Sequence, residues 1–317
     1  QGRQHALQPL GSRAMYLPHA TSLRMGRLGY QSDAQSTLAV SYNGLEGYAA
    51  SLQDALTRPW PAYEAIGIQA PSGDYNQLAV TLLQIENEFY GTIRPKRVIE
   101  PGERPLHALR ARGVEYVEVR LMDLNPFLPV GIDEQTMRFL DVFLLHCLLS
   151  DSPPDSPAEI EALKRNQHLV AERGREPGLK LACGGMEVAL TDWAAQVLGE
   201  LPALARALDE ALGGDGHQAA VQAAQQALHN PALLPSARVL AALPGYGDSY
   251  VAFMLDRSQQ IRSLMLAQPP GAALRQRFAE MAVQSRAQQH AIEVSDTLSF
   301  EQYRREYTSP ARLSPQA

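Results

Sequence analysis

The chain has 317 residues, 45% of them hydrophobic and 20% charged, a balance typical of globular proteins that excludes a long disordered chain. Its 28 Lys and Arg against 34 Asp and Glu leave a net charge of −6, the opposite sign from a general nucleic-acid binder. No run reaches the ~18 consecutive apolar residues of a transmembrane helix, and two cysteines are too few for a disulfide framework. We therefore expect a cytoplasmic protein whose partners are neither nucleic acid nor membrane.

The first 130 residues carry short segments of β character broken by Gly and Pro. Residues 44–56 have helical spacing that stops before Pro59. Period-2 alternation predicts half-buried strands over 83–90 and 115–122. The Pro- and Gly-containing stretch between them, 92–104, reads as a loop.

From about residue 131 Ala, Leu and Gln dominate and helical spacing takes over. Ser156 followed by Glu159 is a helix-start signature, and the tail after Thr308 is expected to fray. The expected helices are 134–149, 156–173, 192–212, 218–229, 235–243, 249–266 and 271–283. Strands first and helices later predict an α+β fold.

The strand over 115–122 places Glu118 and Arg120 on one face, about 7 Å apart. A carboxylate can hold Mg²⁺, and a guanidinium can clamp a phosphoryl or carboxylate oxygen. We expect both side chains in one polar site, with Val117, Val119 and Leu121 packed under helices. The alternative is an exposed sheet face carrying an ordinary ion pair.

A second group of polar residues lies on the strand expected over 83–90, where Glu86, Glu88 and Tyr90 share one face. A basic stretch follows a few residues later, and such a stretch can neutralise nucleotide phosphates. The alternative is a solvated loop balanced by Glu86 and Glu88. The cations of this stretch are Arg94, Lys96 and Arg97.

A third segment, 21–32, contains Arg24 and Tyr30, which suit recognition of a carboxylate and a side chain. His146 and Cys147 are interpreted as core residues of an apolar helix. No Gly-rich phosphate loop, dinucleotide fingerprint or His-based metal motif occurs. Any ATP site is therefore of a kind without a P-loop.

Four segments together resemble glutamate–cysteine ligase of the proteobacterial type. The resemblance runs from about residue 14 through the helical region, weakens after about 285, and so covers nearly all of this chain. It covers only the C-terminal part of the family's chain. The segments are YLPHATSLRMGRLGY at 16–30, LQIENEFYGTIRPKR at 83–97, GVEYVEVRLMDLNPF at 113–127 and GIDEQTMRFLD at 131–141.

The resemblance implies a glutamine-synthetase-like fold, an antiparallel sheet curved into a funnel with helices outside. It also implies ATP- and Mg²⁺-dependent joining of the γ-carboxylate of L-glutamate to the amine of L-cysteine through γ-glutamyl phosphate, with Mn²⁺ as an alternative ion. This is the first step of glutathione synthesis.

Roles follow by resemblance for individual residues. Glu118 resembles a Mg²⁺ ligand, Arg120 a group that stabilises charge on the transferring phosphoryl and acyl oxygens, and Arg24 a substrate-carboxylate contact. The remaining matches are Tyr30 and Tyr90, which resemble walls of the cysteine pocket, and Arg94 with Lys96 or Arg97, which resemble nucleotide-phosphate contacts.

The chain opens on Gln-Gly-Arg-Gln-His without an initiator Met, so we expect a piece of a longer protein. Residues 1–317 are then the C-terminal part of one catalytic domain, with a sheet-forming part at 1–130 and a helical part at 131–317. The family's other metal ligands belong to the missing N-terminal portion, which makes the isolated chain inactive. The alternatives are a related ligase that uses another amine, and a non-catalytic scaffold that binds ATP or an amino acid.

Overall fold

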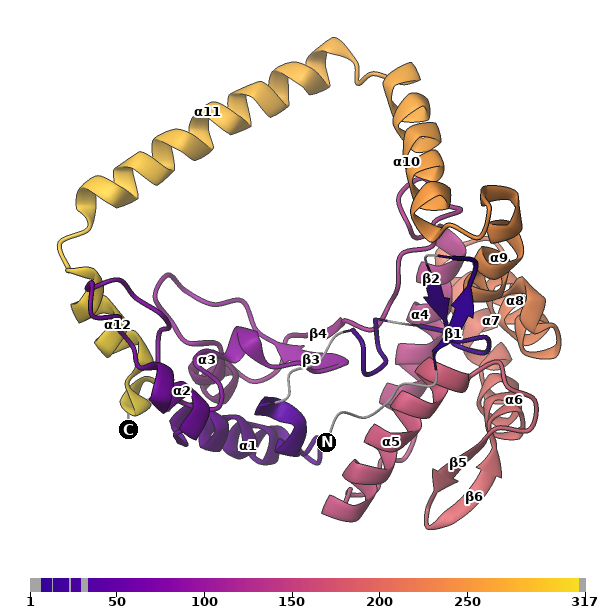
Figure 1. The fold of residues 1–317 in the computed structure, drawn as a ribbon, viewed down its shortest axis with the longest axis horizontal. Coiled ribbons are helices and arrows are strands. Elements are labelled where there is room, and N and C mark those ends of the chain that lie inside the picture. Colours follow the sequence, from indigo (N-terminus) through magenta and orange to yellow (C-terminus); the bar gives the residue numbers. More distant parts are fainter. Residues whose placement is uncertain (1–6, 13, 23, 30–33, 314–317) are drawn as a thin grey trace.

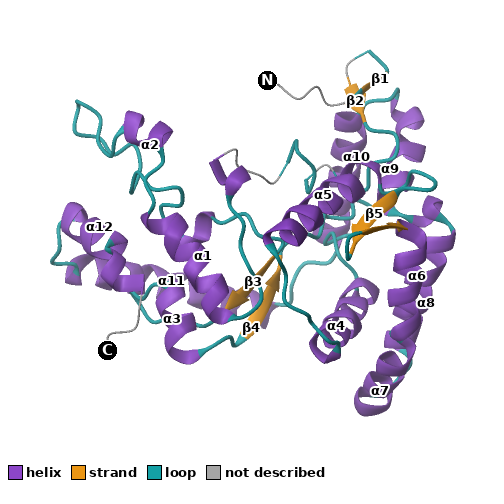
Figure 2. Ribbon diagram, turned by 90° about the horizontal axis from the view of Figure 1, so that it is seen from below, coloured by secondary structure: helices purple, strands orange, loops and turns teal. Residues whose placement is uncertain are grey.

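The computed structural model describes residues 7–12, 14–22, 24–29 and 34–313. Helices predominate, and they form two groups with a short β pair between them (Figures 1 and 2). We call residues 34–120 together with 300–313 the first lobe, and residues 134–267 the second lobe. A long helix crosses from the second lobe back to the first (Figure 1).

The first lobe is built on helices whose apolar faces meet in one core. Its buried side chains include Tyr48, Leu52, Leu83, Leu106 and Leu313. The helical spacing predicted over 44–56 is confirmed. The helices of this lobe are α1 (Leu45–Thr57), α2 (Pro61–Ile66), α3 (Pro105–Arg112) and α12 (Phe300–Thr308).

The second lobe has its own core around Val142, Leu201 and Val221. The predicted cap is confirmed, since the Ser156 side chain accepts a hydrogen bond from the Glu159 amide. Asp133 caps the first helix of this lobe in the same way, accepting from the Thr136 amide. The helices are α4 (Glu134–Leu149), α5 (Pro157–Arg173), α6 (Leu190–Glu200), α7 (Pro202–Leu212), α8 (Gly216–His229), α9 (Pro235–Ala242) and α10 (Tyr250–Ala267).

Two features of the second lobe differ from the prediction. The helix expected over 192–212 is two helices, because Pro202 cannot continue the ladder of the helix before it. A hairpin, β5 (Lys180–Cys183) with β6 (Met186–Ala189), interrupts the helices. Gly184 and Gly185 both have positive φ, as a two-residue hairpin turn requires.

The described strands form three separate antiparallel pairs: β5–β6, β1 (Gln8–Leu10) with β2 (Ala14–Tyr16), and β3 (Ile93–Lys96) with β4 (Tyr116–Val119). The strand predicted over 83–90 is wrong. That segment is irregular around a 3₁₀ turn at Glu86–Glu88, because Glu86 is drawn inward to a buried ion pair with Arg104. The predicted loop at 92–104 begins as strand β3, and the strand predicted over 115–122 is four residues long.

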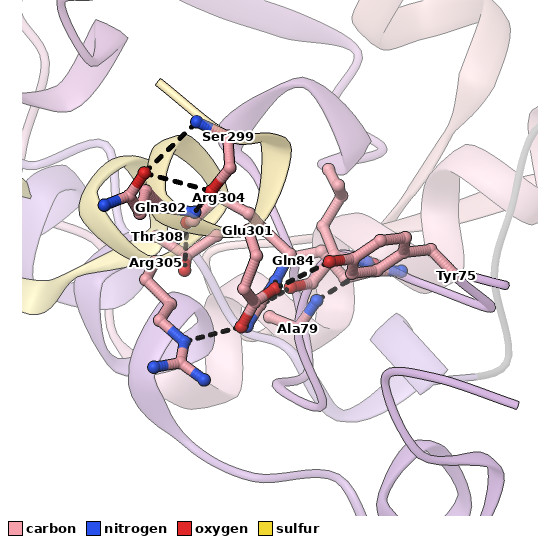
Figure 3. A network of polar contacts seen from close by, with 10 residues as sticks. Tyr75, Ala79, Gln84, Ser299, Glu301, Gln302, Arg304, Arg305 and Thr308 are labelled. Atoms are coloured by element: carbon pink, nitrogen blue, oxygen red, sulfur yellow. Dashed lines mark hydrogen bonds and ion pairs between the residues drawn. The ribbon is translucent and has the colours of Figure 1, made fainter. Parts of the chain in front are cut away.

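The C-terminal segment returns to the first lobe and is held there. Helix α11 (Ala272–Ser295) runs twelve residues beyond the expected end at 283, and α12 follows it. The Arg304 guanidinium donates to the Leu78 carbonyl at 2.6 Å, and the Tyr75 and Phe300 rings meet at 4.6 Å between centroids. The Tyr75 hydroxyl donates to Glu301 of the same helix (Figure 3). The expectation of a frayed tail is wrong over 310–313, since Leu313 is buried in the first core.

The interpretation of Cys147 as a core residue is also wrong. Cys147 is exposed, like Leu148 and Leu149 after it, because the last turn of α4 projects past the core. His146 lies closer in, with Nε2 at 3.5 Å from Glu200 Oε2. None of the described helices combines the length and the apolar character that crossing a bilayer requires.

Candidate functional site

The β3–β4 pair carries most of the predicted site residues. Arg94 lies opposite Glu118, and Lys96 lies opposite Tyr116. Directly opposed residues of an antiparallel pair share a face, so these four side chains stand on one side of the pair. The predicted alternation is therefore correct for the four residues of β4.

Glu118 is the carboxylate of this face. Its side chain is 39% exposed, and Oε2 lies 3.4 Å from Lys96 Nζ in an ion pair without hydrogen-bond geometry. Within the described chain this oxygen accepts no hydrogen bond although it is buried. A buried oxygen with unused acceptor capacity suits a ligand that the structure does not contain.

A Mg²⁺ ion takes six oxygen ligands, usually one or two of them carboxylates. Glu118 fits as one such ligand. Across the residues that the structure describes, no three His, Cys, Asp or Glu side chains gather in an arrangement that could hold a metal. The donor set is therefore compatible with Mg²⁺ and incomplete.

Arg94 is the most buried cation of this face, at 6% exposure. Its Nη2 donates to the Asn87 carbonyl at 3.1 Å, and its guanidinium lies 5.7 Å from the centroid of the Phe89 ring. Burial raises the pKa of the neighbouring Tyr48 phenol, and the positive charge of Arg94 partly offsets this effect. The protein itself thus holds Arg94 in place beneath the site.

The two other cations of the basic run diverge. Lys96 pairs with Glu118, whereas Arg97 lies 3.6 Å from Glu115 Oε2 and donates to the Arg112 carbonyl at 3.0 Å. The alternative of a loop balanced by Glu86 and Glu88 is wrong, since each carboxylate has another partner. Glu86 pairs with Arg104, and Glu88 accepts a hydrogen bond from the Gln84 amide at 2.7 Å.

Three predicted residues approach one end of the β3–β4 pair. The Arg120 amide donates to the Thr92 carbonyl at 2.8 Å, which extends the ladder one step beyond the strands. Arg24 Nη1 donates to the Met122 carbonyl at 2.9 Å, although 98 residues separate them. Tyr90 lies two residues before Thr92 and is 43% exposed. Tyr30 lies outside the described residues.

The opposite face of the pair is less covered than predicted. Val117 is 46% exposed and Leu121 is 42% exposed, while Val119 is half-buried. The expectation that all three pack under helices is wrong for Val117 and Leu121.

Two positioning features were missed by the sequence analysis. The Gln35 side chain makes two hydrogen bonds to the backbone around Tyr90. It donates to the Glu88 carbonyl at 2.8 Å and accepts from the Tyr90 amide at 2.9 Å. The loop before Arg24 is tied to the end of α5, where Arg175 donates to the carbonyls of Pro18 and Ala20. Neither residue belongs to a local pattern, so only the tertiary structure identifies them.

Comparisons with known proteins agree on one family. The family model for glutamate–cysteine ligase matches residues 1–170. A curated glutamate–cysteine ligase from Azotobacter vinelandii is 47% identical over 303 residues, covering 96% of this chain and 57% of the relative. One from Hahella chejuensis is 44% identical, covering 96% and 59%. The chain thus spans under two thirds of the length of the curated relatives it matches.

Solved structures agree with the sequence comparison. A crystal structure of glutamate–cysteine ligase from Francisella tularensis in complex with AMP matches with a TM-score of 0.91 at 33% identity, covering 98% of this chain and 61% of that one. A bifunctional glutathione synthetase from Pasteurella multocida, at 22% identity and a TM-score of 0.54, shares the fold. The predicted α+β class is confirmed.

Proposed function

Because this chain belongs to the glutamate–cysteine ligase family, we propose that it carries part of the machinery that joins L-glutamate to L-cysteine at the expense of ATP. The observation that carries the proposal is the family match over residues 1–170, which contains all the predicted site residues. We place the protein in the cytoplasm, as the C-terminal part of a single catalytic domain. The Francisella relative supports a nucleotide site, since it was solved with AMP.

We assign the β3–β4 face to the phosphate end of the reaction. Glu118 supplies one oxygen ligand to Mg²⁺, which when bound offsets charge on the phosphates of ATP. Lys96 pairs with Glu118 at 3.4 Å and holds that carboxylate near the phosphate-binding face. Arg97 and the buried Arg94 add positive charge to the same basic stretch, residues 94–97.

We assign acyl transfer and substrate binding to the residues near one end of the β3–β4 pair. Arg120 directly follows β4, where its guanidinium stabilises charge on the transferring phosphoryl and acyl oxygens. Arg24 holds a substrate carboxylate, for which a guanidinium is geometrically suited. Tyr90, with Tyr30, forms a wall of the cysteine pocket. Attack of the amine on the acyl phosphate needs the reacting atoms about 3–3.5 Å apart.

The 317 residues alone are expected to be inactive. Phosphoryl transfer depends on positioned cations and metal ions. Among the described residues, Glu118 is the one carboxylate that we propose as a metal ligand. The matched relatives extend well beyond the matched span. We propose that the part outside the match supplies the remaining ligands.

Release of ADP with glutamate and cysteine tests the proposal. We expect no release from the chain alone, and release when the chain is co-expressed with the part of the A. vinelandii relative that lies outside the match. Turnover by the chain alone would contradict the divided site. Turnover with another amine but not with cysteine would indicate a related ligase, and none under any condition would favour a binding scaffold.

A further inference from the structure

Among the elements that the structure describes, helix α11 is the least covered. It has 24 residues, and none of its side chains is buried. It crosses from α10 to α12 at a distance from the other elements (Figure 1). Isolated helices have little stability in water, and most helices gain theirs from packing an apolar face.

The apolar residues of α11 lie on opposite sides of the helix. At 3.6 residues per turn, Leu274, Phe278, Met281 and Ile292 fall on one side. Val283 follows Phe278 by five residues, about 140° round the axis, and Val294 falls near Val283. All six are at least 43% exposed. Exposed apolar side chains gathered on one element are typical of an interaction surface.

The elements on either side of α11 are anchored to the two lobes. At its end, the chain passes into α12, whose Ser299 and Gln302 form a capping box, and Arg304 anchors that helix to Leu78. Before it, α10 is anchored by Phe253, which is 1% exposed and lies 5.8 Å from Phe127 between ring centroids. The helix therefore connects two anchored elements and is exposed along its whole length.

We propose that α11 is a docking helix for the part of the ligase chain that lies outside these residues, and that this part covers both of its sides. The inference rests on the proposed function in that the partner is the remainder of the same ligase. The Azotobacter relative has about two fifths of its length outside the match, enough for a layered partner. A second copy of this chain in a two-fold dimer would cover one self-complementary patch of α11. Apolar residues on opposite sides of the helix instead favour a partner that surrounds it.

Binding to the unmatched part of the A. vinelandii relative, co-expressed as a separate polypeptide, tests the proposal. The variants are Phe278→Glu on one side and Val283→Glu on the other, with Gln284→Glu as a control of equal charge change. Because α11 is exposed, all three variants should leave the melting temperature of the chain alone unchanged. We expect each of the first two to weaken the complex at least tenfold, and the control to bind like the unmodified chain. Amide hydrogen exchange over 274–294 should slow at least tenfold in the complex.

Three results would overturn the proposal: no complex with the unmodified chain, equal binding by all variants, or unprotected α11 amides in the complex. Self-association of the chain that Phe278→Glu abolishes would instead assign the surface to a second copy. A complex that forms through α11 but releases no ADP would count against the proposed function and leave the docking inference intact.

Discussion

Arg104 and Glu86 form a buried ion pair, with Nη2 of the arginine 2.7 Å from Oε2 of the glutamate and side-chain exposures of 2% and 7%. The Arg104 guanidinium also donates to the backbone carbonyl of Tyr307 and lies 4.6 Å from the centroid of the Tyr307 ring. The pair therefore joins the segment before β3 to the C-terminal helix.

Replacing Arg104 with Ala should strongly destabilise the first lobe. Removing one partner leaves a buried carboxylate uncompensated, at a cost of roughly 3–5 kcal/mol. The control is Arg305→Ala on α12, whose side chain is 74% exposed and whose loss should cost about 0–1 kcal/mol. Urea denaturation followed by circular dichroism measures both, and similar losses for the two variants would contradict the assignment.

A side chain at position 174 should be destabilising, because a Cβ on Gly174 would lie 2.7 Å from Thr21 Cγ2 and 2.4 Å from the Val170 carbonyl oxygen. Gly174→Ala should cost about 1–3 kcal/mol by crowding the loop that leads to Arg24. Gly199, on α6, has nothing within 4 Å of a Cβ, so Gly199→Ala should be neutral or stabilising by up to about 1 kcal/mol. Equilibrium unfolding measures the free energy of unfolding of both variants. A larger loss for Gly199→Ala than for Gly174→Ala would contradict the close packing of Gly174 against Thr21 and Val170.

Glu301 should make the docking of α12 sensitive to acid. Hydrogen bonds from Arg304, with smaller contributions from Arg305 and Tyr75, lower the pKa of Glu301 from 4.5 to about 2 (Figure 3). A group whose pKa is depressed by folding contributes stability above its unfolded pKa. That contribution is therefore present above about pH 4.5 and is lost as pH falls toward 2.

Denaturation of the chain at pH 5 and pH 3 measures this effect. Glu301→Gln should be less stable than the unmodified chain at pH 5, with a smaller difference at pH 3. Glu306→Gln, at an exposed position of the same helix, is the control. A stability difference between Glu301→Gln and the unmodified chain that grows as the pH falls would contradict a lowered pKa of Glu301 in the folded state.

In the complete enzyme, Glu118→Gln should lower turnover about 10²–10³-fold, the usual cost of one well-placed electrostatic contact. Glu187→Gln, on an exposed position of β6, should leave turnover unchanged. Because Glu118 is 39% exposed, both variants should keep the melting temperature. Coupled ADP release measures the rates, and normal turnover by Glu118→Gln would remove it from the site.

Tyr90→Ala should weaken the use of cysteine more than glutamate-dependent ATP turnover, because Tyr90 is assigned to the pocket of the amine. The KM for cysteine should rise while the KM for glutamate stays near that of the unmodified enzyme. Equal loss for both substrates would exclude the pocket assignment and leave Tyr90 as a structural residue beside Gln35.

Features of short range were predictable from the sequence, and those set by distant partners were not. Helix α5 was predicted with its cap because Ser156 and Glu159 are three residues apart. The alternation over 83–90 failed because Glu86 is buried by Arg104, 18 residues away. The family resemblance selected the site residues, but the contact between Arg24 and Met122 spans 98 positions and follows from no local pattern.

The burial of Leu313 in the first core has a consequence for synthesis. Most of that core comes from residues 34–109, yet its last buried side chain is translated more than 200 residues later. Contacts so distant in sequence slow folding, and exposed apolar surface favours aggregation meanwhile. The first lobe therefore stays incomplete on the ribosome while the second lobe is made, and a nascent chain that stalls before residue 300 has an open core that chaperones would recognise.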